Sequence, residues 1–356
     1  MQSETREYNV IDDTIVRRTA SEIQLLFRPD APQPALSGTG TTEKAPPLID
    51  DITSVPPVTI RSIESDAVVY AIDGGSSVIA KGGNVEVICW RAGYVCFKGI
   101  HREGEFCESP NILAYNRLNI NSIINDFLAG TDFKRVMDET PLSPVNELRW
   151  MSEWMLLRRL IDEAPEGSLI LMDGTLRANP FFDVKPQHDL FKKAAQNGIH
   201  IASVTKTSSL SLDKAIPIDI MEIGADEQSK TWYRQLNMSL PKDSPWLGDV
   251  YLAGLHPGAD KRYRVDINRY DTEAVDRIFS ILVSVSDDTE FAGYPYPLVA
   301  AHRQARIDLL FKQSIIEALG EELNRLDFSD GLWHFLTGDI HDKLNADVLE
   351  IAAHEQ

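Results

Sequence analysis

Short apolar runs rich in β-branched and aromatic residues recur along the chain, separated by turn residues or amphipathic segments. The run Val-Val-Tyr-Ala-Ile over residues 68–72 is typical of a buried strand. Further strands are predicted over 85–90, 94–97, 168–173, 199–204, 249–253 and 263–267. Because Arg-Ala-Gly at 91–93 is a turn signal, the first three strands should form an antiparallel unit.

Helical periodicity fills most of the intervals between these strands. Helices are predicted over 10–27, 112–133, 146–163, 186–197 and 272–285, and from Pro297 onward. The helix over 146–163 directly precedes the strand 168–173, so it can serve as a crossover that sets this strand parallel to 68–72. The pattern therefore predicts an α/β protein with a mixed sheet flanked by helices.

Changes in composition suggest how the chain is divided. Prolines interleaved with Gly, Ser and Thr mark a connector over residues 28–65 that has no core of its own. An N-terminal helix (1–27) precedes it, the main α/β domain (66–313) follows, and a helical extension (314–356) completes the expected organisation.

Composition and charge narrow the function classes. The chain is 43% hydrophobic and 25% charged, which is ordinary for a globular protein. No apolar run approaches membrane-spanning length and no signal peptide is visible, so we expect a cytoplasmic protein with reduced thiols at Cys89, Cys96 and Cys107. The net charge of −19 argues against indiscriminate coating of DNA, although DNA could still lie in a channel with a basic lining.

Two predicted strands end in an acid followed by glycine and hydroxyl residues. Asp73 precedes Gly-Gly-Ser-Ser, and Asp173 precedes Gly-Thr. If the two strands are parallel neighbours, the carboxylates lie side by side, where they repel each other unless a cation lies between them. This pattern favours a metal site. The alternative is a pair of unrelated turns, because Asp-Gly is also a strong hairpin signal.

Basic groups occur at places where they could meet a phosphate. Lys206 follows the strand 199–204, where it is either a phosphate contact or a solvated strand end. After the rigid Tyr-Pro-Tyr-Pro of 294–297, His302 and Arg306 share one helix face, and Arg303 lies beside them. Although a lone helical histidine is usually structural, this one could add an imidazole to the carboxylates while the arginines approach phosphates.

Four segments together resemble the NurA family of DNA-repair nucleases in their order and approximate spacing. They are Ala-Ile-Asp73-Gly-Gly-Ser, Leu-Met-Asp173-Gly-Thr-Leu, Val-Thr-Lys206-Thr-Ser and Gly-Tyr-Pro-Tyr-Pro-Leu-Val-Ala-Ala-His302-Arg, within about residues 66–312. The resemblance implies an RNase H-like fold related to Piwi domains. It also implies a Mn²⁺-dependent deoxyribonuclease, with Mg²⁺ as the weaker substitute, that cuts DNA exonucleolytically and cleaves single strands. The family acts in DNA end resection as a homodimer with a HerA-type hexameric ATPase.

The resemblance also implies roles for individual residues. Asp73, Asp173 and His302 become metal ligands, joined by a glutamate on the helix before the second acidic strand. Glu153 is the expected glutamate, with Glu147 as the alternative. A catalytic tyrosine is expected at Tyr251 or else at Tyr263, and Lys206 and Arg264 are expected to contact DNA.

Two other function classes remain open on the sequence. Asp-Gly-Gly-Ser is also similar to a segment of the actin-like sugar kinases, but no second glycine-rich adenosine segment follows. A non-catalytic subunit that only docks on a translocase ring is the other alternative. No phosphate loop, nucleophile elbow or dinucleotide fingerprint is present.

Overall fold

The computed structural model describes most of the chain from residue 10 to residue 338. The described ranges are 10–28, 49–51, 55–61, 66–136, 143–179, 181–207, 211–212, 216–217, 230–238, 245–259, 261–271 and 274–338. Most of the proline-rich connector and the last eighteen residues therefore lie outside the described residues.

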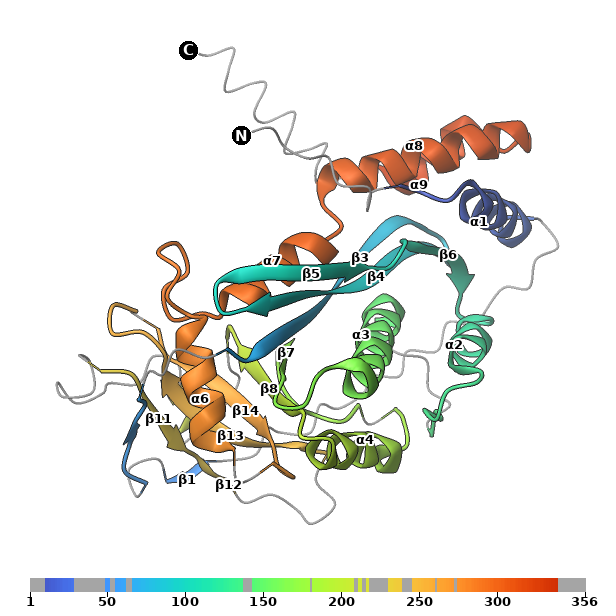
Figure 1. Ribbon diagram of the computed structural model, residues 1–356. Helices are drawn as coiled ribbons and strands as arrows, with labels where there is room; N and C mark the ends of the chain where they lie inside the picture. Colours follow the sequence, from blue (N-terminus) through green and yellow to red (C-terminus); the bar gives the residue numbers. More distant parts are fainter. Residues whose placement is uncertain are drawn as a thin grey trace, which may run out of the picture.

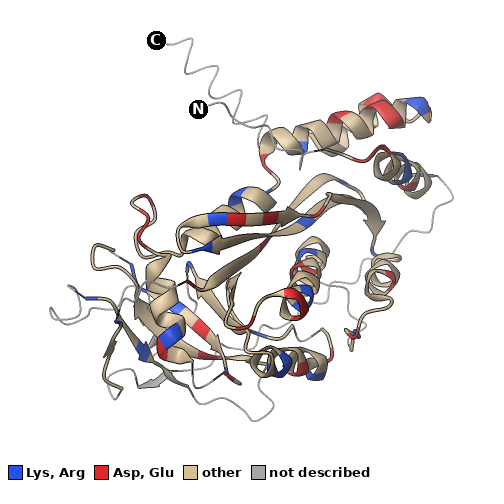
Figure 2. Cartoon of the chain, viewed as in Figure 1, with Lys and Arg blue, Asp and Glu red and all other residues tan. Residues whose placement is uncertain are grey.

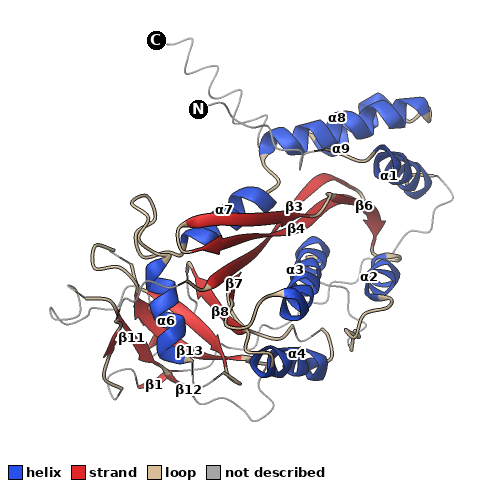
Figure 3. Ribbon diagram, in the orientation of Figure 1, coloured by secondary structure: helices blue, strands red, loops and turns tan. Residues whose placement is uncertain are grey.

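A ten-stranded mixed sheet forms the centre of the molecule (Figures 1 and 3). Its strand order is β2-β11-β13-β14-β8-β7-β3-β4-β5, and β6 pairs with β4. The strands are β2 (Val58–Thr59), β3 (Val68–Gly82), β4 (Val85–Lys98), β5 (His101–Cys107), β6 (Asn111–Asn116), β7 (Leu169–Asp173), β8 (His200–Thr205), β11 (Trp232–Gln235), β13 (Gly248–Gly254) and β14 (Tyr263–Asn268). Two small antiparallel pairs lie apart from it: β1 (Ile49–Asp51) with β12 (Asn237–Met238), and β9 (Ser211–Leu212) with β10 (Ile216–Pro217).

The central strands have the RNase H-like arrangement. The chain passes through the antiparallel strands β3, β4 and β5 and then through helix α3 (Pro144–Glu163). From there it enters β7, which is parallel to β3, and β8, which is parallel to β7. The predicted α/β class and the predicted crossover are therefore confirmed.

Three local predictions are wrong. Strand β3 does not end at Asp73 but continues to Gly82, because Gly74 and Gly75 stay paired with Ala92 and Arg91. Strand β4 likewise runs through the expected turn at 91–93, and the hairpin turns instead at Gly83, whose φ is +57°. The first part of the expected helix over 112–133 is strand β6, paired with β4, and only α2 (Ile120–Leu128) is helical.

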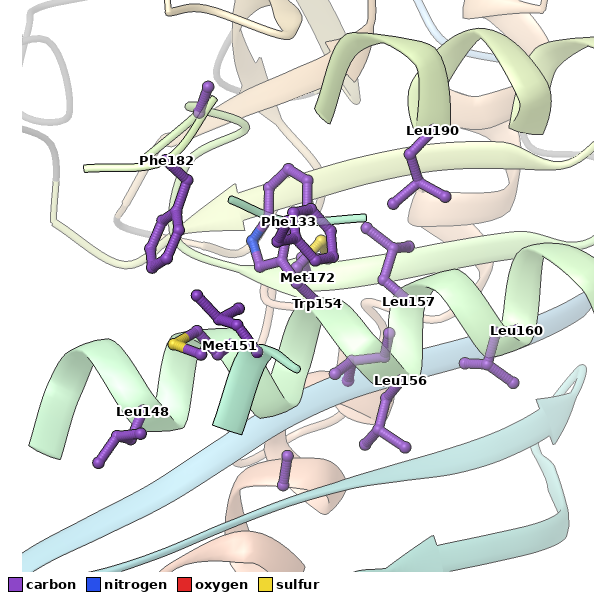
Figure 4. Packing of buried hydrophobic residues seen from close by; sticks show 14 of the residues in the cluster. Phe133, Leu148, Met151, Trp154, Leu156, Leu157, Leu160, Met172, Phe182 and Leu190 are labelled. Carbon is purple, nitrogen blue, oxygen red and sulfur yellow. The ribbon is translucent and has the colours of Figure 1, made fainter. Parts of the chain in front are cut away.

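One face of the sheet is covered by α3 and α4 (Val184–Gln196) (Figure 1). The buried side of α3 packs into the largest apolar cluster, together with residues that precede and follow β7 (Figure 4). The side chains labelled there are Phe133, Leu148, Met151, Trp154, Leu156, Leu157, Leu160, Met172, Phe182 and Leu190. This packing fixes the axis of α3 against β3, and therefore fixes where its polar side chains lie.

The other face carries α6 (Val275–Ser284) and α7 (Tyr296–Ala305), which pack against β3, β7, β8, β13 and β14 in a second cluster. A third cluster joins the far half of the β3–β4 hairpin to α1 (Asp13–Leu26), α8 (Leu309–Arg325) and α9 (Asp330–Thr337). Helix α8 spans the domain boundary expected at residue 313.

Charged residues of both signs are interspersed over the helices and strands (Figure 2). All three cysteines are free thiols, as expected. Within the described ranges, no helix combines the length and the apolar character needed to cross a bilayer.

Candidate active site

Two acids meet where β7 ends beside β3. The last hydrogen-bonded register pair of these parallel strands is Ile72 with Met172, and each is followed by an aspartate, Asp73 and Asp173. Beyond this point β3 continues while β7 stops, so within the described residues no strand pairs with this edge of β3 after Ile72, and we call this unpaired edge the notch. The predicted convergence of the two strand-borne carboxylates is thus present in the structure.

His302 reaches this notch from helix α7. Its Nδ1 lies 2.8 Å from Oδ2 of Asp73, whose other oxygen accepts the N–H of Gly74 at 2.8 Å. Asp73 is buried, whereas the His302 side chain is 53% exposed. Because a carboxylate only accepts hydrogen bonds, Nδ1 of a neutral His302 carries the proton and Nε2 keeps a lone pair for a ligand.

Asp173 is held by two side chains. Its Oδ2 lies 2.7 Å from Nζ of Lys206, and its Oδ1 accepts a 3.1 Å hydrogen bond from the hydroxyl of Tyr294. The ammonium group of Lys206 also lies 5.6 Å from the centre of the Tyr294 ring. Burial, and then the nearby charges of Asp173 and Asp73, raise the pKa of the Tyr294 phenol above its ordinary value, so this residue remains a hydrogen-bond donor.

Glu153 is the third acid, and it comes from helix α3. It is 8% exposed, and its Oε1 accepts a 2.9 Å hydrogen bond from Arg149. Burial raises the pKa of Glu153 to about 7; the Arg149 charge opposes this shift, while the charges of Asp73 and Asp173 reinforce it. A β-carbon at Gly74 would lie 2.5 Å from this Oε1, so Glu153 lies directly over the residue that follows Asp73.

Glu147, the alternative to Glu153, lies elsewhere. Its Oε1 is 3.6 Å from Nε of Arg135, and both side chains are 5% exposed. Burial raises the pKa of Glu147 to about 7 as well, but only Arg135 contributes a charge effect, which opposes the shift. The structure therefore brings Glu153, and not Glu147, to the two aspartates.

The glycine pair after Asp73 allows both helices to approach the strand. A β-carbon at Gly74 would lie 2.5 Å from Oε1 of Glu153, and one at Gly75 would lie 2.1 Å from the carbonyl oxygen of Ala305 at the end of α7. Arg91, which is paired with Gly75 on β4, donates to that same carbonyl at 2.9 Å. The Asp-Gly-Gly segment thus provides close packing rather than a turn.

The tyrosine that contacts the acids is Tyr294, and not Tyr251 or Tyr263, the two expected from the sequence. Tyr251 lies on β13, separated from β7 by β14 and β8, and packs on Phe279 of α6 with ring centres 5.4 Å apart. The ring of the alternative, Tyr263, packs at a tilt against the ring of Tyr294, with centres 5.4 Å apart, so Tyr294 lies between Tyr263 and Asp173. A signal was available, since Tyr294 begins the Tyr-Pro-Tyr-Pro segment that leads to His302.

Arg264 does not reach the surface. It is 2% exposed and makes two hydrogen bonds to Asp266, at 2.6 and 2.7 Å, above the ring of Trp246. Asp266 in turn accepts the N–H of Leu176, in the segment that follows Asp173. The expected contact of Arg264 with DNA is therefore not retained, because the guanidinium group is occupied inside the protein.

The other expected DNA contacts are on the surface. The side chains of Lys206, Arg303 and Arg306 are 46%, 48% and 56% exposed. Arg303 lies 3.3 Å from Glu290 and Arg306 lies 3.8 Å from Asp308, in exposed ion pairs that contribute little stability. These cations remain available to a phosphate.

The donor chemistry of the site suits a hard divalent cation, because three carboxylates and one imidazole are ligands that Mn²⁺ and Mg²⁺ accept. The mutual repulsion that helps to raise the pKa of Glu153 is the situation that a cation relieves. In the part of the chain that the structure describes, no three His, Cys, Asp or Glu side chains stand close enough to hold an ion as they are. Coordination would therefore require the acids to exchange their present partners, Lys206 and Arg149 among them.

A strand-borne pair of aspartates, joined by a helix-borne glutamate on an RNase H-like sheet, defines a nuclease-type site. The sequence matches the NurA domain over residues 67–307, and the chain belongs to the NurA family. No curated protein matched the sequence.

The solved structures that the chain matches include one NurA nuclease and two endonucleases V. The NurA nuclease from Sulfolobus solfataricus is 18% identical, with a TM-score of 0.50, over 78% of this chain and 90% of that one. The catalytic domain of human endonuclease V is 14% identical, with a TM-score of 0.35, over 71% and 84% of the two chains. Endonuclease V from Ciona intestinalis in complex with DNA is 12% identical, with a TM-score of 0.34, over 68% and 89%.

Proposed function

We propose that this NurA-family protein is a metal-dependent nuclease that hydrolyses phosphodiester bonds in DNA. The observation that carries the proposal is the convergence of Asp73, Asp173 and Glu153 from three separate elements, with Glu153 packed over Gly74 and His302 bonded to Asp73. Core packing alone does not favour three acids at one place, because buried carboxylates destabilise one another.

Each residue has a distinct role in this proposal. Asp73, Asp173, Glu153 and Nε2 of His302 would hold Mn²⁺, or Mg²⁺ as the weaker substitute. When bound, such ions activate a water molecule and stabilise the charge on the leaving oxygen. Tyr294 orients the Asp173 carboxylate through its hydrogen bond.

The surface cations Lys206, Arg303 and Arg306 would position the DNA backbone, because charge-assisted hydrogen bonds to phosphate oxygens fix a strand without reading its sequence. Lys206 is bonded to Asp173, and Arg303 directly follows His302 on α7, so a strand that enters beside α7 would meet cations next to the acids. The net charge of −19 makes such a local concentration of cations more important for DNA capture.

Membership of the NurA family supports a role in DNA repair. We propose that the protein acts in DNA end resection, as an exonuclease and a single-strand endonuclease, as a homodimer together with a HerA-type hexameric ATPase. Light scattering on the purified protein tests the dimer. Co-purification with a HerA-type ATPase, and stimulation by it of duplex-end degradation, tests the partnership.

The activity is tested with end-labelled single-stranded DNA and blunt duplex DNA, in Mn²⁺, in Mg²⁺ and in EDTA. We expect cleavage that is strongest in Mn²⁺ and absent in EDTA. A protein that binds an ATPase ring but cuts neither substrate would be a docking subunit instead. Turnover of ATP with a sugar, and no cleavage of DNA, would indicate a kinase.

A further inference from the structure

Arg149 is the cation that pairs with Glu153 on helix α3. Its Nη1 donates to Oε1 of Glu153 at 2.9 Å and lies 3.4 Å from the carbonyl oxygen of Gly74. Among the described residues, no acceptor takes a hydrogen bond from its Nε or Nη2. The Arg149 side chain is 32% exposed and lies over Gly74, the residue that follows Asp73, so its two remaining donors are available beside the acids.

Helix α3 provides an internal comparison. Arg159 and Glu163 form a second pair with the same four-residue spacing and a distance of 3.0 Å. That pair is on the surface, with side chains 45% and 54% exposed, where an ion pair of this spacing contributes little stability. In the Arg149 pair the side chain of the acid is only 11% exposed, and it lies over Gly74, next to Asp73.

The sheet is shaped to admit Arg149 as well as Glu153. A β-carbon at Gly74 would lie 2.6 Å from Cγ of Arg149, a distance shorter than real contacts allow. The stem of the arginine therefore passes directly over the residue that follows Asp73. A solvent-facing helix pair would not require such close packing. The absence of a side chain at Gly74 is therefore what allows Arg149 to take this position.

We propose that Arg149 is a catalytic residue that neutralises Glu153 before metal binding and afterwards binds a non-bridging oxygen of the scissile phosphate. This inference rests on the proposed nuclease function. With Glu153 engaged as a metal ligand, the Arg149 guanidinium group would be released from that carboxylate and could donate to a phosphate oxygen instead. Arginine stays protonated throughout, so it moves no proton and supplies only charge and hydrogen bonds to the developing oxyanion.

Arg149→Gln should raise the affinity for Mn²⁺ and lower kcat. Without DNA, Mn²⁺ measured by calorimetry should bind more tightly, by roughly 2- to 10-fold, because a competing cation has been removed. With saturating DNA and Mn²⁺, kcat should fall on the order of 100-fold, because a donor to the transition state has been lost. Arg149→Lys, which keeps the charge but not the planar fork, should recover only part of that rate.

Arg159→Gln is the matched control and should leave both measurements unchanged. If Arg149 only positions Glu153, the glutamine variant should bind Mn²⁺ more weakly than the wild type, which would overturn the proposal. Cleavage at the wild-type rate by Arg149→Gln would also overturn it. Failure of the nuclease function itself is distinguishable, because the wild-type protein would then show no Mn²⁺-dependent cleavage.

Discussion

Gly75 lies so close to Ala305 that an added β-carbon would be 2.1 Å from the carbonyl oxygen of that residue. This contact seats the last turn of α7 on β3, two residues from Asp73, while Arg91 donates to Ala305 and to Arg306 at 2.9 and 2.8 Å. The position of His302 over Asp73 therefore depends on a glycine in another part of the chain.

Gly75→Ala should displace the end of α7 and separate His302 from Asp73. We expect a loss of DNA cleavage of roughly 10-fold or more, because misplacing a catalytic group by about 1 Å can reduce the rate 100-fold. Thermal unfolding should also occur at a lower temperature. Gly104→Ala is the control, since a β-carbon there would meet no neighbour closer than 4.0 Å. An alanine at position 75 that leaves both measurements unchanged would show that α7 is not held in this way.

Tyr294→Phe should reduce kcat by roughly 10-fold, because it removes one hydrogen bond to a charged group while keeping the ring. Tyr251→Phe and Tyr263→Phe should retain wild-type cleavage, since neither hydroxyl contacts Asp173 in this structure. Steady-state kinetics on a labelled single strand distinguishes the three. A larger effect at Tyr251 than at Tyr294 would restore the tyrosine chosen from the sequence.

The pKa of Glu153 links stability to pH. Because it is raised from 4.5 to about 7 in the folded protein, the native state keeps a proton that the unfolded chain releases. In EDTA the unfolding temperature should therefore fall as the pH rises from about 4.5 to about 7, and added Mn²⁺ should reverse the fall.

Glu153→Gln should weaken both this pH dependence and the stabilisation by Mn²⁺. Glu147→Gln is an informative control, because the pKa of Glu147 is also raised to about 7 but this residue lies beside Arg135. It should reduce the pH dependence in EDTA and leave the effect of Mn²⁺ intact. Scanning calorimetry at pH 5.5 and 8 makes the comparison, and an undiminished Mn²⁺ effect in Glu153→Gln would exclude Glu153 as a ligand.

Arg264 and Lys206 should behave in opposite ways. Arg264→Met leaves the buried Asp266 uncompensated, so we expect destabilisation of about 3–5 kcal/mol. Lys206→Met should change the free energy of unfolding little and weaken DNA binding. The slope of the logarithm of the binding constant against the logarithm of the salt concentration should fall by about 1, the value for one lost phosphate contact. Urea unfolding and fluorescence anisotropy at several salt concentrations test the pair. A folded Arg264→Met protein with selectively weak DNA binding would support the original DNA role.

Particular residues show which features of the fold and the site could be predicted from the sequence. The sequence could place Asp73 and Asp173 side by side, because two parallel strands joined by a helix are usually neighbours in the sheet and the connection is nearly always right-handed. The sequence could not show that β3 continues past Asp73, because Asp-Gly-Gly is a turn signal unless helices pack onto the glycines. Ile112 to Tyr115 form a short apolar run that fits a strand or a helix equally well, and only pairing with β4 decides between them.

Two further predictions, for Arg264 and for the catalytic tyrosine, concerned the positions of side chains rather than the bounds of helices and strands. Arg264 and Asp266 are two residues apart on a strand and therefore share one face, so their pairing was visible in the sequence. Their burial was not visible, because it arises from Trp246 and the segment after β7. Tyr294 reaches Asp173 only because α7 packs across β3, a contact between residues far apart in the chain.

Single-turnover cleavage of a labelled DNA strand in Mn²⁺, compared between the wild-type protein and Asp73→Asn, tests the central assignment most directly. The asparagine keeps the shape of the side chain and can still accept the N–H of Gly74, so folding should survive. We predict a rate reduced by about 1,000-fold or more, in keeping with the loss of a ligand that supports metal-ion catalysis. A folded Asp73→Asn protein that cuts within a few-fold of the wild-type rate would contradict the account.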